Sequence, residues 1–302
     1  MFCKSCGNQI SKGEGFCKNC GEKVVIPLKW WERNKFLSWF RKKIVIIVGI
    51  IAMVFIVLIV IGTNTNTGNS IQITQATQDE IAQSVVNILC PSTVQGENAS
   101  GGSGTIINED GLILTNSHII PQDKTNIHVD EQGCLVVLPD PKTGQTKDVY
   151  LAHPVVINGL SDKYDLAYMN IYAAYYDTDK GEYAGVYPRK FPSFDDTKRC
   201  KNENVQLGEP VRIFGYPAIS GGYTLTITDG VVSSFPGDGL IVTSAKISHG
   251  NSGGLAIDKY GCMIGVPSMV SSDEAESLGV ITSMDLVRKF DAEVTTYLNN
   301  LK

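Results

Sequence analysis

The stretch Ser248-His249-Gly250-Asn251-Ser252-Gly253-Gly254 lies between two apolar runs, residues 239–247 and 255–266, that both fit strands. A serine enclosed by glycines between two strands predicts an exposed hydroxyl on a tight turn. The backbone N–H groups on either side of such a serine are free to bind a developing oxyanion. The same pattern also fits a plain glycine-rich hairpin turn. A catalytic interpretation therefore depends on a histidine and an aspartate in suitable settings elsewhere in the chain.

Two other local patterns supply these groups, in the chain order His, Asp, Ser. His118 lies at the end of a predicted strand, just before Pro121, and Asp165 begins the apolar run 166–171. Nucleophilic acyl transfer needs this set, because a neutral imidazole takes the proton of the serine hydroxyl and a buried carboxylate fixes the tautomer of the imidazole. Asp165 also fits a strand-end cap, and Asp162 lies three residues earlier.

Short apolar runs separated by Gly, Pro and Asp-Gly predict an all-β barrel or sandwich. The predicted strands cover residues 84–90, 102–107, 112–120, 134–138, 149–151, 166–171, 211–214, 223–234, 239–247, 255–258 and 262–266. The C-terminal segment differs, because its apolar residues recur at helical spacing from Leu286 to Leu301 behind Ser283 as a candidate N-cap. The sequence therefore predicts a β domain that ends in a helix.

The motifs at residues 102–105, 114–118, 165–167 and 250–254 resemble those of trypsin-like serine proteases, and most closely those of the Deg/HtrA type. The resemblance extends over roughly residues 80–290. It implies a chymotrypsin-like pair of six-stranded β-barrels with the active site at their junction.

The resemblance also implies a role for each site residue. Ser252 would be the nucleophile, His118 the general base and then acid, and Asp165 the carboxylate that orients the histidine. The backbone N–H groups of Gly250 and Ser252 would form the oxyanion hole. The protein would then be a serine endopeptidase.

The chain departs from that family's pattern in several places. No PDZ domain follows before Lys302, so we expect no regulation through such a domain. The spacers around residues 134–148 and 177–201 are enlarged. His249 stands where the family usually has proline, and Lys246 where a small residue is common. We expect these two residues to alter the primary specificity pocket or the hydrogen bonding near the nucleophile.

The N-terminal segment, residues 1–25, contains two C-x-x-C-G turns formed by Cys3 and Cys6 and by Cys17 and Cys20. Two such pairs supply four thiolates for one tetrahedral ion, with no position left for a catalytic water. The segment resembles a zinc ribbon, with a structural zinc ion that would supply its folding energy. Disulfides or redox-active cysteines are the alternatives. No cofactor is expected for catalysis.

Residues 44–61 are 18 consecutive uncharged residues, and we predict a single transmembrane helix over 44–62. A basic, aromatic juxtamembrane segment (26–43) precedes it, and a polar linker (63–78) separates it from the protease domain (79–302). Residues 1–43 carry a net charge of +7 and residues 44–302 a net charge of −12. Because positive residues stay on the cytosolic side, the ribbon should be cytosolic and the protease domain extracytoplasmic. An acidic domain makes nucleic acid an unexpected partner.

Three histidines, His128, His153 and His249, are interpreted as structural. Four cysteines remain in the protease domain, and the sequence leaves open whether they form disulfides or stay as buried thiols: Cys90, Cys134, Cys200 and Cys262.

The sequence thus predicts a membrane-anchored serine endopeptidase that acts on unfolded or damaged extracytoplasmic proteins. The alternative is a membrane sensor or scaffold with a protease-like domain outside and a zinc ribbon inside that binds a cytosolic protein.

Overall fold

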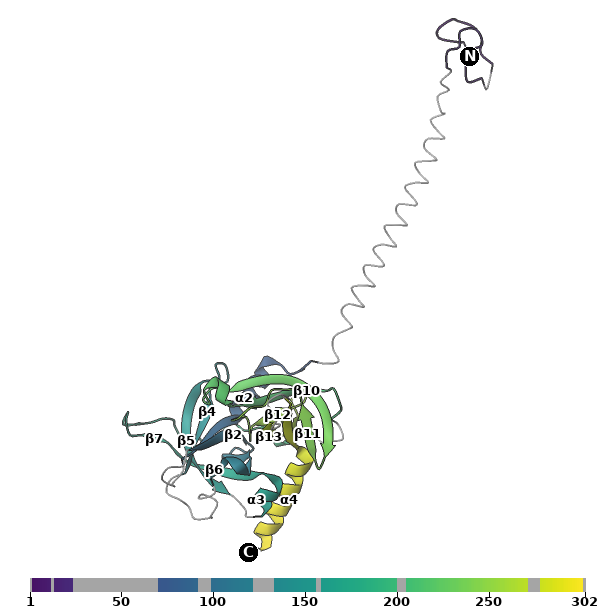
Figure 1. The fold of residues 1–302 in the computed structure, drawn as a ribbon. Coiled ribbons are helices and arrows are strands. Elements are labelled where there is room, and N and C mark those ends of the chain that lie inside the picture. Colours follow the sequence, from purple (N-terminus) through teal and green to yellow (C-terminus); the bar gives the residue numbers. More distant parts are fainter. Residues whose placement is uncertain are drawn as a thin grey trace. The chain divides into compact units, whose positions relative to one another are not determined.

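The computed structural model describes residues 2–11, 14–23, 70–91, 99–121, 133–155, 159–199, 205–270 and 278–300. The chain forms two compact units, residues 1–67 and 68–302 (Figure 1). The predicted juxtamembrane segment (26–43) and transmembrane helix (44–62) lie outside the described residues. No helix among the described residues is long and apolar enough to cross a membrane.

The described residues of the first unit, 2–11 and 14–23, form two knuckles with the same backbone pattern. In each, the glycine after the second cysteine has a positive φ, +69° at Gly7 and +71° at Gly21, and its N–H donates to the carbonyl of the first cysteine. The positive φ turns the chain back around the sulfurs, a conformation that glycine adopts without steric cost. Cys3, Cys17 and Ile10 form a buried apolar cluster among these described residues.

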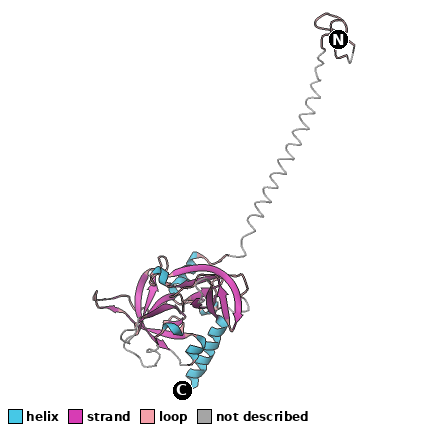
Figure 2. Cartoon of the chain, viewed as in Figure 1, coloured by secondary structure: helices cyan, strands magenta, loops and turns pink. Residues whose placement is uncertain are grey.

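The second unit contains two closed antiparallel β-barrels of six strands each (Figure 2). The first barrel has the strand order β1-β2-β3-β6-β5-β4 and consists of β1 Val85–Cys90, β2 Ser100–Ile106, β3 Leu112–Thr115, β4 Cys134–Pro139, β5 Thr146–Val155 and β6 Ala167–Ala174. The second has the order β10-β11-β14-β13-β12-β9 and consists of β9 Pro210–Gly215, β10 Thr226–Gly237, β11 Leu240–Thr243, β12 Leu255–Ile257, β13 Met263–Val270 and β14 Gly279–Ser283. The predicted all-β architecture is confirmed.

Helices and short turns complete this unit. The helices are α2 Gln75–Ser84, α3 Leu160–Tyr164 and α4 Met284–Asn300, and the 3-10 turns are η1 Ser117–Ile119, η3 Asp196–Lys198 and η5 Ala218–Ser220. A small hairpin pairs β7 Tyr176–Asp177 with β8 Glu182–Tyr183, within the spacer that the sequence showed to be enlarged.

Each barrel has its own apolar core, and a third cluster lies where the barrels meet. That third cluster joins Leu114 of the first barrel to Phe214 and Leu255 of the second, and α4 packs against it through Phe290. Val287, Phe290 and Val294 of α4 are buried, which confirms the helical spacing expected at the C-terminus. The residues that lead into the predicted site are therefore anchored in one shared core.

Three local expectations need correction. The predicted linker, residues 63–78, is too long, because α2 begins at Gln75 behind a Thr74 N-cap whose hydroxyl accepts from the Thr77 N–H. The strand predicted over residues 112–120 ends at Thr115, so His118 lies in η1. Ser283 precedes α4, but its buried hydroxyl has no hydrogen-bond partner among the described residues and so does not cap the helix.

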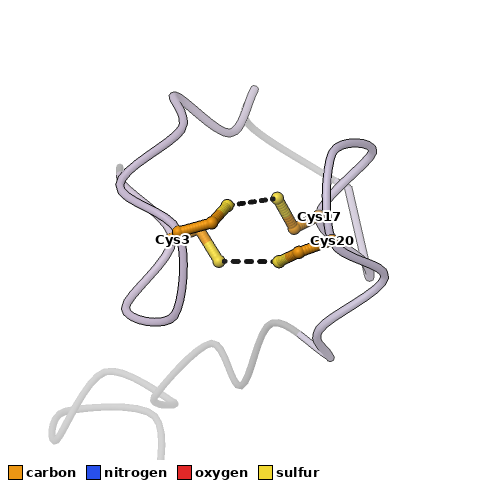
Figure 3. Close-up of side chains that lie close together, drawn as sticks. Cys3, Cys17 and Cys20 are labelled. Atoms are coloured by element: carbon orange, nitrogen blue, oxygen red, sulfur yellow. Dashed lines mark hydrogen bonds between the residues drawn. The ribbon is translucent and has the colours of Figure 1, made fainter.

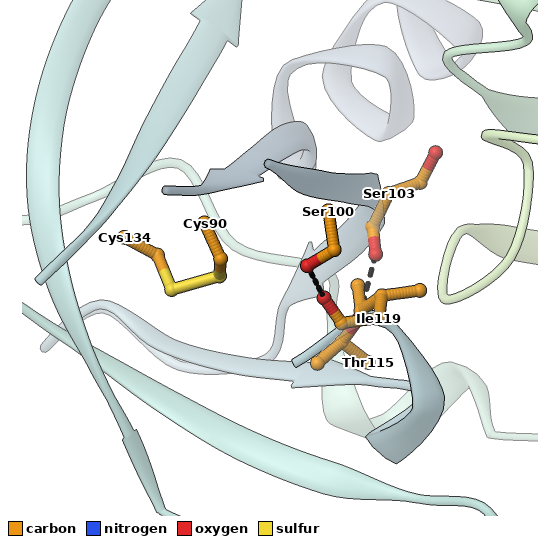
Figure 4. The surroundings of a disulfide bond; sticks show 6 residues. All are labelled: Cys90, Ser100, Ser103, Thr115, Ile119 and Cys134. Carbon is orange, nitrogen blue, oxygen red and sulfur yellow. Dashed lines mark hydrogen bonds between the residues drawn. A yellow bond between two sulfur atoms is a disulfide. The ribbon is translucent and has the colours of Figure 1, made fainter. Parts of the chain in front are cut away.

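The structure pairs two of the cysteines that the sequence left open. Cys90 and Cys134 form a fully buried disulfide that joins adjacent strands β1 and β4 of the first barrel (Figure 4). Cys262 is also disulfide-bonded, whereas Cys200 lies outside the described residues. The second unit is therefore a disulfide-bonded domain.

Candidate active site

Asp165 is held in place by the turn that ends helix α3. It is the C-cap of α3 and has a left-handed backbone, with φ 51°. A positive φ is uncommon for a residue other than glycine, and aspartate is among the residues that tolerate it best. The Asn116 side-chain amide donates to the Asp165 backbone carbonyl at 2.7 Å, which ties this turn to the segment before His118. The carboxylate is thereby fixed at the end of β3.

The Asp165 carboxylate is surrounded by donors from two chain segments. His118 Nδ1 lies 2.9 Å from its Oδ1 and 2.8 Å from its Oδ2, and the His118 backbone N–H donates to Oδ1 at 3.1 Å. The Ser117 hydroxyl donates to Oδ1 at 3.1 Å, and the Ser268 hydroxyl donates to Oδ2 at 2.7 Å. These contacts orient the His118 ring with Nδ1 toward the carboxylate and leave Nε2 for another partner.

The donors also set the protonation state of the carboxylate. Burial by itself raises the pKa of Asp165, but the hydrogen bonds and charge of His118, together with the Ser268 hydroxyl, outweigh it and hold the pKa below its ordinary value of 3.8. The group is therefore ionised at neutral pH and available to stabilise an imidazolium.

Ser252 follows a tight turn that requires glycine. The Asn251 N–H donates to the Ser248 carbonyl at 3.0 Å, and Gly250 at the third position of this turn has φ +99°. One positive φ at that position identifies a type II turn. A Cβ at residue 250 would lie 2.2 Å from the Tyr216 carbonyl oxygen, so no larger residue fits.

The hydrogen bonds of residues 248–254, which we call the serine turn, leave several backbone N–H groups without an acceptor among the described residues. Its carbonyls from Ser248 to Ser252 each accept a hydrogen bond, from Asn251 N, Ala218 N, Ser103 Oγ, Gly254 N and Ser103 N respectively. The N–H groups of Asn251, Gly253 and Gly254 donate within the protein. The N–H groups of Ser248, His249, Gly250 and Ser252 have no acceptor in the part of the chain that the structure describes. The two expected oxyanion donors, Gly250 and Ser252, are therefore free to bind another acceptor.

The Ser252 hydroxyl lies in the same network as the carboxylate. It donates to the Ser268 carbonyl at 3.0 Å, and the Ser268 hydroxyl bonds Asp165. Within the described residues, no hydrogen bond joins the Ser252 hydroxyl to the His118 ring. Catalytic hydrogen bonds are often long without substrate and tighten once substrate is bound. Ser268 thus connects the serine and the carboxylate in the resting arrangement.

Two contributing residues escaped sequence-based prediction. Ser268 lies on β13, in a strand whose pattern is that of any apolar strand, and Asn116 was seen only as part of a motif. Of the histidines interpreted as structural, His153 stacks on Tyr172 with 3.8 Å between the ring centroids, and His249 is an exposed residue of the serine turn. His128 lies outside the described residues. Lys246 is exposed, and the Thr228 hydroxyl donates to its backbone carbonyl.

Comparison with known proteins agrees with this geometry. The sequence profile of the trypsin-like peptidase domain matches residues 102–266, which include His118, Asp165 and Ser252. The chain belongs to the trypsin-like peptidase family. The match confirms the family predicted from the sequence, that of the trypsin-like serine peptidases.

Relatives of this peptidase are found among Deg/HtrA proteins. A probable periplasmic serine endoprotease DegP-like of Brucella suis is 31% identical over 188 residues, which cover 59% of this chain and 29% of that protein. Serine protease HTRA1 of Xenopus tropicalis is 28% identical over 232 residues, covering 71% of this chain and 41% of that protein. The chain thus spans less than half the length of either relative.

A solved structure shares the fold. The crystal structure of the serine endoprotease from Yersinia pestis superimposes with a TM-score of 0.50 over 73% of this chain and 66% of that one, at 23% identity. This likeness supports the double-barrel architecture.

A second cluster of reactive groups lies in the first unit. The sulfurs of Cys3, Cys6, Cys17 and Cys20 all lie within 4.8 Å of one another (Figure 3). Cys3 and Cys20 are 3.5 Å apart, and Cys6 and Cys17 are 3.7 Å apart, between sulfur atoms. Four sulfurs at about 2.3 Å from a tetrahedral zinc ion would be about 3.8 Å apart, so the cluster fits the ion.

The ionisation of these thiols also suits a cation. The backbone at Asn8 and neighbouring groups lower the pKa of Cys6 to about 7. The backbone at Glu22 lowers the pKa of Cys20, but the adjacent Cys6 and Cys3 sulfurs outweigh it and raise it to about 12. Four thiolates this close repel one another, and a bound divalent cation would remove that repulsion.

Proposed function

We propose that this protein is a membrane-anchored serine endopeptidase that cleaves peptide bonds of extracytoplasmic proteins, with unfolded or damaged proteins as its substrates. The observation that carries the proposal is the oriented His118–Asp165 pair, which Ser268 connects to the Ser252 hydroxyl, together with the Gly250 and Ser252 N–H groups that have no acceptor among the described residues. Acyl transfer needs a nucleophile, a base and an oxyanion site together. The Deg/HtrA relatives support the choice of protein substrates.

In the proposed mechanism, His118 takes the proton of the Ser252 hydroxyl as its oxygen attacks the scissile carbonyl carbon. The carbonyl oxygen becomes an oxyanion that accepts from the N–H groups of Gly250 and Ser252, and Asp165 stabilises the imidazolium. The carbon–nitrogen bond then breaks, and His118 gives its proton to the leaving amine. Water attacks the resulting ester, His118 takes a proton from that water, and the proton returns to the Ser252 oxygen as the acid product leaves.

We place the peptidase unit outside the cytoplasmic membrane and the N-terminal unit in the cytosol. The charge-free stretch at residues 44–61 with basic residues before it supports a single span in this orientation. The state of the cysteines supports it independently, because the peptidase unit is disulfide-bonded whereas the four cysteines of the first unit are free. Disulfides persist in oxidising compartments, and free thiolate clusters persist in the reducing cytosol.

Spheroplasts that produce the full-length chain should cleave fluorescein-labelled casein added outside, and phenylmethylsulfonyl fluoride should stop the cleavage. Casein is unfolded and cannot cross the membrane, so the assay reports both activity and location. Spheroplasts without the gene provide the background rate. Cleavage that appears only after lysis would contradict the location, and no cleavage before or after lysis would contradict the peptidase function.

For the first unit we propose a structural zinc site formed by Cys3, Cys6, Cys17 and Cys20, in a ribbon that binds a cytosolic protein. The buried apolar cluster of the two knuckles consists of Ile10 and two of the cysteines, which is too small a core to hold them together. The bound ion would supply that stability.

The purified full-length chain should contain one zinc ion, measured by inductively coupled plasma mass spectrometry. Cys6→Ser should lower the zinc content to near zero, since a site with three thiolates binds the ion much more weakly. Ser5→Ala, an exposed non-ligand neighbour, is the matched control and should retain the ion. A zinc-free wild-type chain from zinc-supplemented medium, or equal loss in both variants, would refute the site.

A further inference from the structure

Ser103 is a fully buried polar residue that belongs to one barrel and forms hydrogen bonds with the other. It lies on β2 of the first barrel, paired with Asn87 of β1. Its carbonyl accepts from the Thr115 hydroxyl at 2.7 Å within the same barrel (Figure 4). Within the described residues, the other hydrogen bonds of its side chain and its N–H are made to residues of the second barrel. The residue is thus positioned by the first barrel and acts on the second.

The Ser103 hydroxyl uses both its donor and its acceptor at the serine turn. It donates to the Gly250 carbonyl at 2.6 Å and accepts from the Tyr216 N–H at 2.9 Å. The Ser103 N–H donates to the Ser252 carbonyl at 2.8 Å. One residue therefore holds the carbonyls of both neighbours of Asn251, Gly250 and Ser252.

The glycine before Ser103 makes this approach possible. A Cβ at Gly102 would lie 3.0 Å from the Ser252 carbonyl oxygen and 2.9 Å from an Ile119 methyl. Both contacts are tighter than nearly all real Cβ contacts, so glycine at 102 lets β2 run against the serine turn without displacing Ile119 or the Ser252 carbonyl. The contacts of Gly102 and Ser103 thus give a structural reason for the motif at residues 102–105, which contains none of the catalytic residues.

Glycine at 250 leaves the direction of its own N–H unfixed. Glycine adopts either sign of φ readily, so the peptide between His249 and Gly250 can rotate between type II and type I turns unless its neighbours are held. In the structure the Ala218 N–H holds the His249 carbonyl at 2.8 Å, and the Ser103 hydroxyl holds the Gly250 carbonyl. These two bonds fix the peptides on either side of the Gly250 Cα.

We propose that Ser103 is a positioning residue whose hydroxyl holds the serine turn in the conformation that presents the Gly250 N–H to the oxyanion. This inference rests on the proposed peptidase function. Ser103 acts through the turn and, among the described residues, makes no hydrogen bond to the His118–Asp165 pair or to the Ser252 hydroxyl. Its loss should weaken oxyanion stabilisation and leave proton transfer intact.

Ser103→Ala in the full-length chain should lower the kcat for casein cleavage about 10-fold to 100-fold, because losing a whole oxyanion donor costs about 10²–10³. KM and the midpoint of the pH–rate profile should not change, since substrate binding and the base are untouched. The second-order rate of labelling by a fluorophosphonate probe should fall by a similar factor, because its phosphoryl oxygen occupies the oxyanion position. Rates are normalised to the folded fraction measured by circular dichroism.

Thr105→Val is the matched control, because Thr105 lies on the same strand, is fully buried, and has a hydroxyl with no hydrogen-bond partner among the described residues. It should keep the wild-type kcat. If Ser103→Ala fails to fold, Ser103→Cys, which keeps a weak donor of similar size, should give an intermediate kcat. Wild-type kcat in the Ser103 variants, or a loss confined to KM, would overturn the proposal while the peptidase function stands. An inactive, unlabelled wild-type chain would overturn the peptidase function itself.

Discussion

Replacing Ser252 with alanine should lower the kcat for casein cleavage by roughly 10⁶-fold. The loss is this large because acyl transfer through a covalent intermediate has no substitute for the attacking oxygen. KM should change little, because the oxyanion site and the barrel junction remain. Residual hydrolysis should come only from the N–H groups of the serine turn and from binding. The measurement is steady-state cleavage of fluorescein-labelled casein by equal amounts of folded full-length protein.

Ser234→Ala is the control for this variant, because Ser234 is an exposed serine of β10 outside the site. It should cleave casein at the wild-type rate. A Ser252→Ala chain with more than about one hundredth of wild-type activity would show that another group attacks the substrate, since removal of a nucleophile of this type costs roughly 10⁶.

Replacing Asp165 with asparagine should lower kcat roughly 10⁴-fold. The amide keeps the shape of the side chain, but it cannot accept the Nδ1–H of His118 with full negative charge or stabilise the imidazolium. Asp162→Asn is the matched control, because Asp162 is an exposed carboxylate three residues away that caps α3 at Gly159. It should retain activity. Equal losses in the two variants would contradict the assignment of the orienting carboxylate to Asp165.

The same variant should also change how stability depends on pH. The folded-state pKa of Asp165 lies below its ordinary value of 3.8, so the carboxylate stabilises the folded protein above that pH. This contribution is lost as the pH falls through the lower, folded-state pKa. Urea unfolding between pH 2 and pH 7 should therefore show a stability gap between wild type and Asp165→Asn that is constant near neutrality and narrows in acid. A gap that widens as the pH falls would contradict the direction of the pKa shift.

Much of the architecture could be predicted because its signals are local. The short apolar runs and the Asp-Gly turn at residues 110–111 marked the strands, and Phe290 with Val294 marked the C-terminal helix. His118 and Asp165 could be named because each stands at the boundary of an apolar run. The structure brings these two side chains into contact at 2.8 Å.

What the sequence could not supply depends on contacts between distant segments. Ser103 and Ser268 lie 147 and 16 residues from their partners in the serine turn, Gly250 and Ser252, and neither contact can be read from the strand that carries the serine. Helix α2 was missed because its sequence is mostly polar, and its buried Ile81 is defined only by packing on the barrels. The strand that leads to His118 ended earlier than predicted because η1 turns the chain at Ser117.

The central claim is that Ser252 is the nucleophile of a working peptidase. The most direct test is to incubate the folded full-length chain with a fluorophosphonate probe, digest it, and locate the adduct by tandem mass spectrometry. We predict one phosphonyl group per chain, on the Ser252 oxygen, with none on chain denatured before the probe is added. No adduct on the folded chain, or an adduct on a residue other than Ser252, would contradict the claim.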